Sequence, residues 1–138
     1  MKKLSSLIIP IFVLTGCQAK AKPVVQHNYH EIKGRRINWE DIFSQEESDY
    51  LVYFYSEHCG YCSSIKNDVI SYYLKTDKVM YFVCTDLGAT FGPQNNLVGI
   101  DNVTNFYIFG TPFLVRIMEF KVLEYYVGAS SILEFINN

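Results

Sequence analysis

Charged residues and cysteines are both scarce in this chain of 138 residues. Charged side chains make up 19% of the sequence and the formal net charge is −2, which argues against a nucleic-acid-binding protein, because such proteins normally show a basic balance or a basic stripe. Four cysteines are too few for a small disulfide scaffold, and their spacing lacks the two close pairs of a zinc ribbon. By contrast, 49% of the residues are hydrophobic and 16% are aromatic, so the chain can bury the core of one domain.

The N-terminus lacks the apolar length of a membrane span. Two lysines precede an apolar stretch over 4–13, whereas about 20 apolar residues are needed to cross a bilayer. This pattern predicts a signal peptide over 1–16. The Leu-Thr-Gly-Cys sequence that ends at Cys17 resembles the lipobox of bacterial lipoproteins, in which the cysteine is acylated and becomes the mature N-terminus. The alternative is an ordinary secretory signal followed by an accidental cysteine.

The lipobox resemblance implies a location outside the cytoplasm. A Cys17 that carries two or more acyl chains would anchor the protein stably at the extracytoplasmic face of the bacterial cell membrane. Residues 17–28 are polar and without periodicity, and we interpret them as a tether. The folded domain is predicted to span 29–138.

Strand and helix patterns alternate along the predicted domain. The run 51–55 is apolar and aromatic throughout, which is typical of a central strand covered on both faces. A Ser-x-x-Glu capping box at Ser131 predicts the start of the last helix. Strands are expected at 29–32, 51–55, 79–85, 113–118 and 122–127, and helices after Asn38, over 63–75 and from Ser131, with 97–109 ambiguous between a short helix and irregular chain.

The chemistry is concentrated in Cys59-Gly60-Tyr61-Cys62, which follows a predicted buried strand and opens a predicted helix. This spacing puts two sulfurs within disulfide reach and aims the first at unpaired N–H groups and the positive end of the helix dipole. Both effects stabilise a thiolate, so Cys59 is the predicted nucleophile and Cys62 the thiol that resolves the mixed disulfide. Gly60 keeps the approach to Cys59 open. The alternatives are a structural disulfide and half of a metal site.

Three short sequences accompany this motif: Phe54 in the strand before it, Gly110-Thr111-Pro112 before a later strand, and Val127-Gly128 before the last helix. Together with Cys59-Gly60-Tyr61-Cys62 they make the chain resemble the thioredoxin superfamily over about residues 29–138. The resemblance implies an α/β thioredoxin fold, with a central mixed β-sheet flanked by helices. It also implies a cis bond between Thr111 and Pro112, with Thr111 offering its backbone to an extended substrate segment.

Two departures from that family concern the cysteines. Thioredoxins have Trp where this chain has His58, and they often have a buried carboxylate where it has Tyr53. That acid normally helps to deprotonate the inner cysteine, so here Cys62 would lose its proton to water, to the substrate or to Glu57. His58 either stabilises the Cys59 thiolate as an imidazolium or replaces Trp as a docking surface. The Gly-Tyr pair and the Thr before proline are more similar to bacterial periplasmic disulfide isomerases.

These features predict a membrane-anchored thiol-disulfide oxidoreductase, a reductase or an isomerase, that acts on thiols and disulfides of exported proteins. No cofactor, metal or nucleic acid is expected, because the cysteines carry the electrons. A reductase would need a membrane protein to pass electrons from the cytosol, and an oxidase would need a re-oxidant. The substrate-binding residues are predicted to be His58, Gly60, Tyr61, Thr111 and Pro112.

Two alternatives remain open from the sequence. One is a non-catalytic peptide-binding or chaperone module with a thioredoxin fold, in which the cysteines form a structural disulfide. The other concerns Cys84, which lies in the predicted strand 79–85 and is interpreted as an inert core residue rather than a third redox partner.

Overall fold

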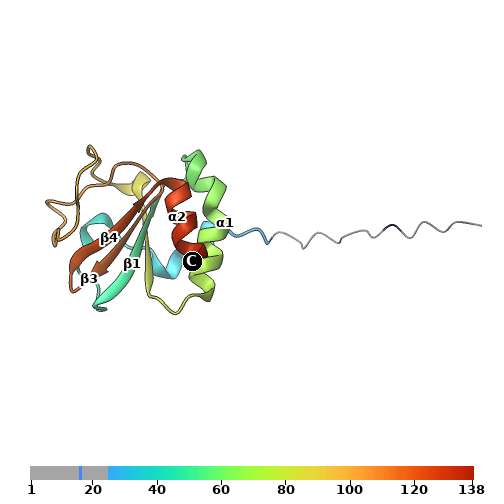
Figure 1. Ribbon diagram of the computed structural model, residues 1–138, viewed down its shortest axis with the longest axis horizontal. Helices are drawn as coiled ribbons and strands as arrows, with labels where there is room; N and C mark the ends of the chain where they lie inside the picture. The colour runs from blue at the N-terminus through green and yellow to red at the C-terminus, as the bar shows by residue number, and fades with distance from the viewer. Residues whose placement is uncertain (1–15, 17–24) are drawn as a thin grey trace, which may run out of the picture.

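The computed structural model describes residue 16 and residues 25–138, so residues 1–15 of the predicted signal peptide and Cys17 lie outside the described residues. Four strands form one mixed sheet in the order β2-β1-β3-β4. Two helices, α1 (Gly60–Lys75) and α2 (Gly128–Asn137), pack together against one face of it (Figure 1). In the described part of the chain, no helix is long and apolar enough to cross a membrane.

The central strand is β1 (Asp49–Tyr55), as its apolar sequence predicts. It pairs in parallel with β2 (Met80–Cys84) and antiparallel with β3 (Phe113–Met118), so its backbone is bonded on both sides. β3 continues through a tight turn into β4 (Lys121–Val127), which confirms the predicted hairpin. Every residue of β1 after Asp49 is buried.

Alternate side chains of β1 enter two separate cores. Val52 and Phe54 point to the face covered by Trp39 and by chain from the irregular region 88–109. Leu51, Tyr53 and Tyr55 point to the opposite face, toward α1 and α2. No helix forms within 97–109, so irregular chain covers the first face on the side away from the two long helices (Figure 1).

The predicted first strand at 29–32 is wrong. Tyr29–Arg35 form a 3-10 helix, η1, in which only Ile32 is fully buried. The reason is local, because Asn28 and Glu31 form a reciprocal capping box that fixes a helical turn: the Asn28 side chain accepts from the His30 N–H at 2.9 Å, and the Glu31 carboxylate accepts from the Asn28 N–H at 2.8 Å. The predicted helix after Asn38 is likewise reduced to three residues, η2 (Trp39–Asp41), and the Asn38 side chain does not cap it.

The start of one long helix agrees with the prediction and the start of the other differs. α1 begins at Gly60 with Cys59 as its N-cap residue, as the predicted position of the cysteine motif at the first turn of a helix requires. α2 begins at Gly128, three residues before the predicted capping box, so Ser131 lies within the helix and does not start it. Gly128 has a φ of 85°, a left-handed conformation that favours glycine and lets the chain turn from β4 directly into α2.

Candidate active site

The cysteine motif lies at the edge of the sheet where the parallel strands β1 and β2 both end. β1 ends at Tyr55, a short loop follows, and Cys59 caps the first turn of α1. In β2, Cys84 pairs in register with Tyr55, and η3 (Thr85–Leu87) follows at the same edge. The first turns after both strands therefore surround the motif, as expected for the carboxyl ends of adjacent parallel strands.

Cys59 is half-buried, and its sulfur makes two contacts. The backbone N–H of Cys62 donates to the Cys59 Sγ at 3.2 Å, and the Cys59 thiol donates to the carbonyl oxygen of Thr111 at 3.4 Å. Burial raises the pKa of Cys59, but hydrogen bonds with the side chains of Cys62 and Thr111 and with the Cys62 and Tyr61 N–H groups outweigh it, so the net pKa is lowered. The helix N-terminus thus favours the thiolate at this sulfur.

Cys62 lies one helical turn further along α1, and its environment is opposite in character. Its side chain is 0% exposed, and burial, followed by the hydrogen bond with Cys59, raises its pKa to about 11. The two sulfurs of one short motif are therefore unlike. The outer sulfur favours the anion and the inner sulfur favours the neutral thiol.

The Thr111-Pro112 peptide bond is cis, as the sequence resemblance implies. Thr111 is separated from Cys59 by 52 positions in the chain, yet its carbonyl oxygen is the acceptor that the Cys59 thiol contacts. Pro112 is buried, and its carbonyl oxygen accepts from the Gly128 N–H at 3.0 Å, which ties the start of β3 to the start of α2. The backbone before the proline is thus held beside the reactive sulfur.

The other predicted substrate-binding residues lie at the surface next to Cys59. His58 and Gly60 are exposed, and the Tyr61 side chain is 74% exposed. A Cβ at Gly60 would meet no atom within 4 Å, so the backbone next to Cys59 is uncrowded. The structure brings all five predicted residues close to the motif, while their part in substrate binding stays a prediction.

Sequence reasoning missed Asp86, which anchors the loop in front of Cys59. Its carboxylate accepts from the Ser56 hydroxyl at 2.6 Å and from the Glu57 N–H at 2.9 Å, and Ser56 in turn accepts from the His58 N–H at 3.1 Å. The hydrogen bonds from Ser56 and Glu57 lower the pKa of Asp86. Asp86 follows closely after β2, the strand parallel to β1, and this position in the sequence could have predicted that it lies at the same edge of the sheet as Cys59.

Cys84 is buried in β2 and belongs to the same core as Cys62. Its thiol donates to the Asp86 carboxylate at 3.6 Å, and burial raises its pKa. These properties are consistent with the interpretation as an inert core cysteine. In the described part of the chain, Cys59, Cys62 and Cys84 are free thiols, and no group of three potential metal ligands gathers there.

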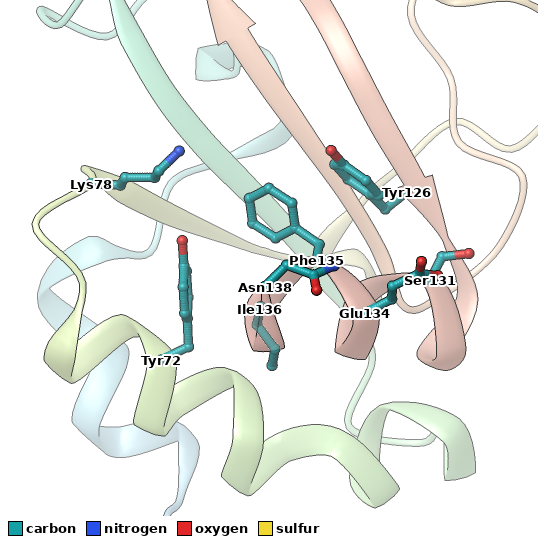
Figure 2. Close-up of a pocket in the computed structure, with 8 residues that line it drawn as sticks. All are labelled: Tyr72, Lys78, Tyr126, Ser131, Glu134, Phe135, Ile136 and Asn138. Carbon is teal, nitrogen blue, oxygen red and sulfur yellow. The ribbon is translucent and has the colours of Figure 1, made fainter.

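A pocket of about 560 Å³ lies near the far end of α1, among Tyr72, Tyr126 and Phe135 (Figure 2). The Phe135 ring packs against both tyrosine rings, with centroid separations of 6.1 and 4.7 Å, and the Lys78 ammonium lies 5.8 Å from its centroid. No predicted site residue lines this pocket. The candidate chemistry therefore belongs to the sheet edge and not to this hollow.

No protein-family model matches the chain, and no curated protein matches it either. Solved structures do resemble it. Mitochondrial thioredoxin 3 from Saccharomyces cerevisiae, in its oxidised form, is 15% identical over 79% of this chain and 96% of its own, with a TM-score of 0.52. A thioredoxin from Nicotiana alata is 19% identical over 75% of this chain and 90% of its own, with a TM-score of 0.50. This likeness shows that the chain has the thioredoxin fold, which confirms the predicted α/β fold class.

Proposed function

We propose that this protein is a thiol-disulfide oxidoreductase, with Cys59 as the nucleophile and Cys62 as the resolving thiol. The observation that carries the proposal is the difference between the two sulfurs. Cys59 is partly exposed with a lowered pKa, whereas Cys62 is fully buried with a pKa raised to about 11. Thiol-disulfide exchange needs an accessible thiolate for attack and a second, protected thiol for release.

The exchange proceeds in two displacements. The Cys59 thiolate attacks one sulfur of a substrate disulfide, and the other substrate sulfur leaves with the electron pair of the broken S–S bond. Cys62 then loses its proton and attacks the Cys59 Sγ, which forms the Cys59–Cys62 disulfide and releases the second substrate sulfur as a thiolate. Both substrate sulfurs take up protons from water. The substrate gains two electrons and the protein loses two, so no cofactor is required, and the reverse sequence oxidises a substrate.

The backbone before the cis proline is the proposed docking point for the substrate. Thr111 presents its carbonyl oxygen 3.4 Å from the Cys59 Sγ, where an extended segment next to a substrate disulfide would pass. His58, Gly60 and Tyr61 add exposed surface next to Cys59. A segment held by this surface and by Thr111 would bring its disulfide to Cys59.

The setting of the reaction is a separate proposal that rests on the sequence. The lipobox-like sequence at Cys17 supports a lipid anchor on the extracytoplasmic face of the bacterial membrane, where exported proteins would be the substrates. A membrane protein that delivers electrons would then be the partner of a reductase. A disulfide isomerase would need no such partner for each turnover.

The proposed activity is tested by reduction of insulin with dithiothreitol in the presence of the full chain. We expect the wild type to accelerate the reduction and Cys59→Ser to abolish the acceleration. Cys84→Ala is the matched control, because it removes a cysteine outside the motif and should leave the rate unchanged. If the wild type binds unfolded peptides but does not accelerate the reduction, the peptide-binding alternative is correct.

A further inference from the structure

Three buried tyrosine hydroxyls have no hydrogen-bond partner among the residues that the structure describes, those of Tyr29, Tyr53 and Tyr55. The Tyr53 and Tyr55 side chains are 1% and 0% exposed, so their hydroxyls lie well inside the domain. Buried polar groups are nearly always paired in native proteins, because an unpaired one forfeits its bonds to water. Three in one place therefore call for an explanation.

The fold does pair its buried tyrosines elsewhere. Tyr50, on the same strand as Tyr53 and Tyr55 but on the other face of the sheet, donates to the Ile42 carbonyl oxygen at 2.7 Å. Tyr81 on β2 donates to the Glu47 carboxylate at 2.6 Å. The unpaired hydroxyls are confined to the face of β1 that is covered by α1.

The three rings form one cluster against the cysteine motif. The rings of Tyr29 and Tyr55 are stacked with centroids 4.1 Å apart, and the rings of Tyr53 and Tyr55 lie 6.3 Å apart and nearly parallel. Tyr53, Tyr55 and Cys62 belong to the same buried core, and Tyr29 and Cys59 pack against it. The titratable and charged groups that face this cluster are Cys59, Cys62, Cys84, Glu57, Arg36 and Lys66.

Tyr53 lies in the same buried core as the Cys62 thiol, and Tyr29 packs against that core. Burial raises the pKa of both tyrosines, and a charge on Cys62 raises it further in each case. Both hydroxyls therefore stay protonated at neutral pH and are available as donors. Phenylalanine would fill the same space without an unpaired hydroxyl, so packing alone does not explain tyrosine at these positions.

We propose that the hydroxyls of Tyr29 and Tyr53 donate hydrogen bonds to the Cys62 sulfur, directly or through one water molecule, as it becomes a thiolate in the resolving step. This inference rests on the proposed function and adds two positioning residues to it. The Cys62 thiol gives its proton to water, and an electron pair of the Cys62 sulfur forms the bond to the Cys59 Sγ. The bond between Cys59 and the substrate sulfur breaks, and the substrate sulfur leaves with its electron pair. The tyrosines lose no proton and supply only the stabilising dipoles.

The test follows the two displacements separately. The reduced full chain is mixed with one equivalent of dithiobis-nitrobenzoate, which releases one coloured thiolate when Cys59 attacks and a second when Cys62 resolves the mixed disulfide. We expect Tyr53→Phe and Tyr29→Phe each to leave the first phase unchanged and to slow the second about tenfold at neutral pH, as for loss of a hydrogen bond to a charged group. The Cys62→Ala variant, which cannot resolve, identifies any release from other cysteines.

The pH profile separates this role from a structural one. Loss of a donor disfavours the Cys62 thiolate, so the second phase of each variant should shift to higher pH and converge with the wild type in strong alkali. Tyr50→Phe is the matched control, because it removes the hydrogen bond to Ile42. It should lower the denaturant midpoint and leave the second phase unchanged, whereas Tyr53→Phe should not lower the midpoint.

The two phases test the tyrosine inference and the proposed function separately. Second phases equal to the wild type in both Tyr29→Phe and Tyr53→Phe would overturn the inference and leave the proposed function intact. If Tyr53→Phe does not fold, Tyr29→Phe alone decides, since Tyr29 lies outside the sheet. If the wild type shows no first phase that depends on Cys59, the proposed function itself fails.

Discussion

At the scale of single residues, position relative to the N-terminus of α1 sets the chemistry of each cysteine. The Cys59 sulfur accepts a helix N–H and lies at the surface end of the site, while the Cys62 sulfur is enclosed by the core of the domain. Burial disfavours a thiolate, and hydrogen bonds to the sulfur favour it. The same thiol group therefore has opposite tendencies three residues apart.

The first prediction concerns alkylation of the reduced protein by iodoacetamide. Because the pKa of Cys59 is lowered, its alkylation rate should reach half of the maximum at a pH below about 8.5, the value for a free cysteine. Cys62 should react slowly, since it is buried and its pKa is raised. Peptide mapping after alkylation at several pH values measures both rates.

A faster reaction at Cys62 than at Cys59 would reverse the assigned roles. The variants provide an independent check on substrates. Cys62→Ala should trap mixed disulfides through Cys59, because no thiol remains to resolve them, whereas Cys59→Ala should trap few.

The second prediction concerns Asp86. Its carboxylate holds the loop before Cys59, and the hydrogen bonds from Ser56 and Glu57 lower its pKa below the unfolded value. Its contribution to stability is therefore fully present above the unfolded pKa of about 3.9 and is lost as the pH falls through the folded pKa. Asp86→Asn should lower the free energy of unfolding by about 1 kcal/mol at neutral pH, and the difference should shrink in acid.

Urea denaturation at neutral and at acid pH measures this difference. The matched control is Asp68→Asn, which neutralises an exposed carboxylate on α1 and should change stability little. Equal effects of the two substitutions at neutral pH would show that Asp86 does not hold the loop through its charge.

At the scale of elements, the pattern of hydrophobic residues predicts the strands whose side chains enter a core. The run 51–55 and the hairpin 113–127 were recognisable because their apolar residues enter cores on both faces or on one. The segment 29–32 contains only two large hydrophobic residues, and the Asn28–Glu31 capping box turns it into η1. In a short segment with one buried residue, local hydrogen bonds between side chains and the backbone determine the conformation instead.

The start of α2 also shows that a local sequence signal can be overridden by a neighbouring residue. The Ser131 capping box is a valid local signal, but Gly128 already turns the chain into the helix three residues earlier. The contact between Thr111 and Cys59, the Asp86 anchor and the tyrosine cluster all join segments distant in sequence. The family resemblance predicts the position of Thr111 beside Cys59. The Asp86 anchor and the tyrosine cluster depend on side-chain orientations that no local sequence pattern predicts.

The third prediction concerns the turn of the β3–β4 hairpin. Glu119 and Phe120 have φ values of 49° and 61°, which cost a residue with a side chain about 1 kcal/mol. Glycine adopts this conformation freely and is preferred in such turns. Phe120→Gly should therefore raise the free energy of unfolding by about 1 kcal/mol.

Thermal or urea denaturation of the variant checks this prediction. Lys121→Gly is the control, because Lys121 is the first residue of β4 and has a strand conformation, so glycine there should destabilise the hairpin. A loss of stability in Phe120→Gly similar to that in Lys121→Gly would show that the Phe120 side chain contributes more than its backbone strain costs.

At the scale of the whole molecule, the candidate site lies at the edge of the sheet where β1 and β2 end, with Cys59 at the surface end of the site. The lipobox-like Cys17 lies outside the described residues.

The fourth prediction concerns that anchor. If Cys17 is acylated, the wild type should enter the detergent phase in detergent phase partitioning, while Cys17→Ser should stay in the aqueous phase. Cys84→Ser is a suitable control for loss of a cysteine elsewhere. Partitioning of both wild type and Cys17→Ser into the aqueous phase would exclude the lipoprotein interpretation.

The fifth prediction concerns the redox poise of the pair. An interaction that stabilises the thiolate of the reduced protein raises the reduction potential. The hydrogen bonds at Cys59 act in this direction, and Tyr53 places no negative charge beside Cys62 to oppose it. We therefore expect a potential above the value of about −270 mV for thioredoxin, toward about −180 mV for an isomerase. If His58 contributes as an imidazolium, His58→Trp should lower it, and no change would mean that His58 serves only docking.

The most direct test of the central claim is a redox titration of the full chain in glutathione buffers of defined ratio, read out by alkylation and mass shift at Cys59 and Cys62. We expect one two-electron transition between the dithiol and the Cys59–Cys62 disulfide, with a midpoint above about −270 mV. A midpoint at or below that value would contradict the thiolate argument and favour a dedicated reductase. A pair that stays in one state across the whole range would contradict the proposal that these cysteines exchange disulfides at all.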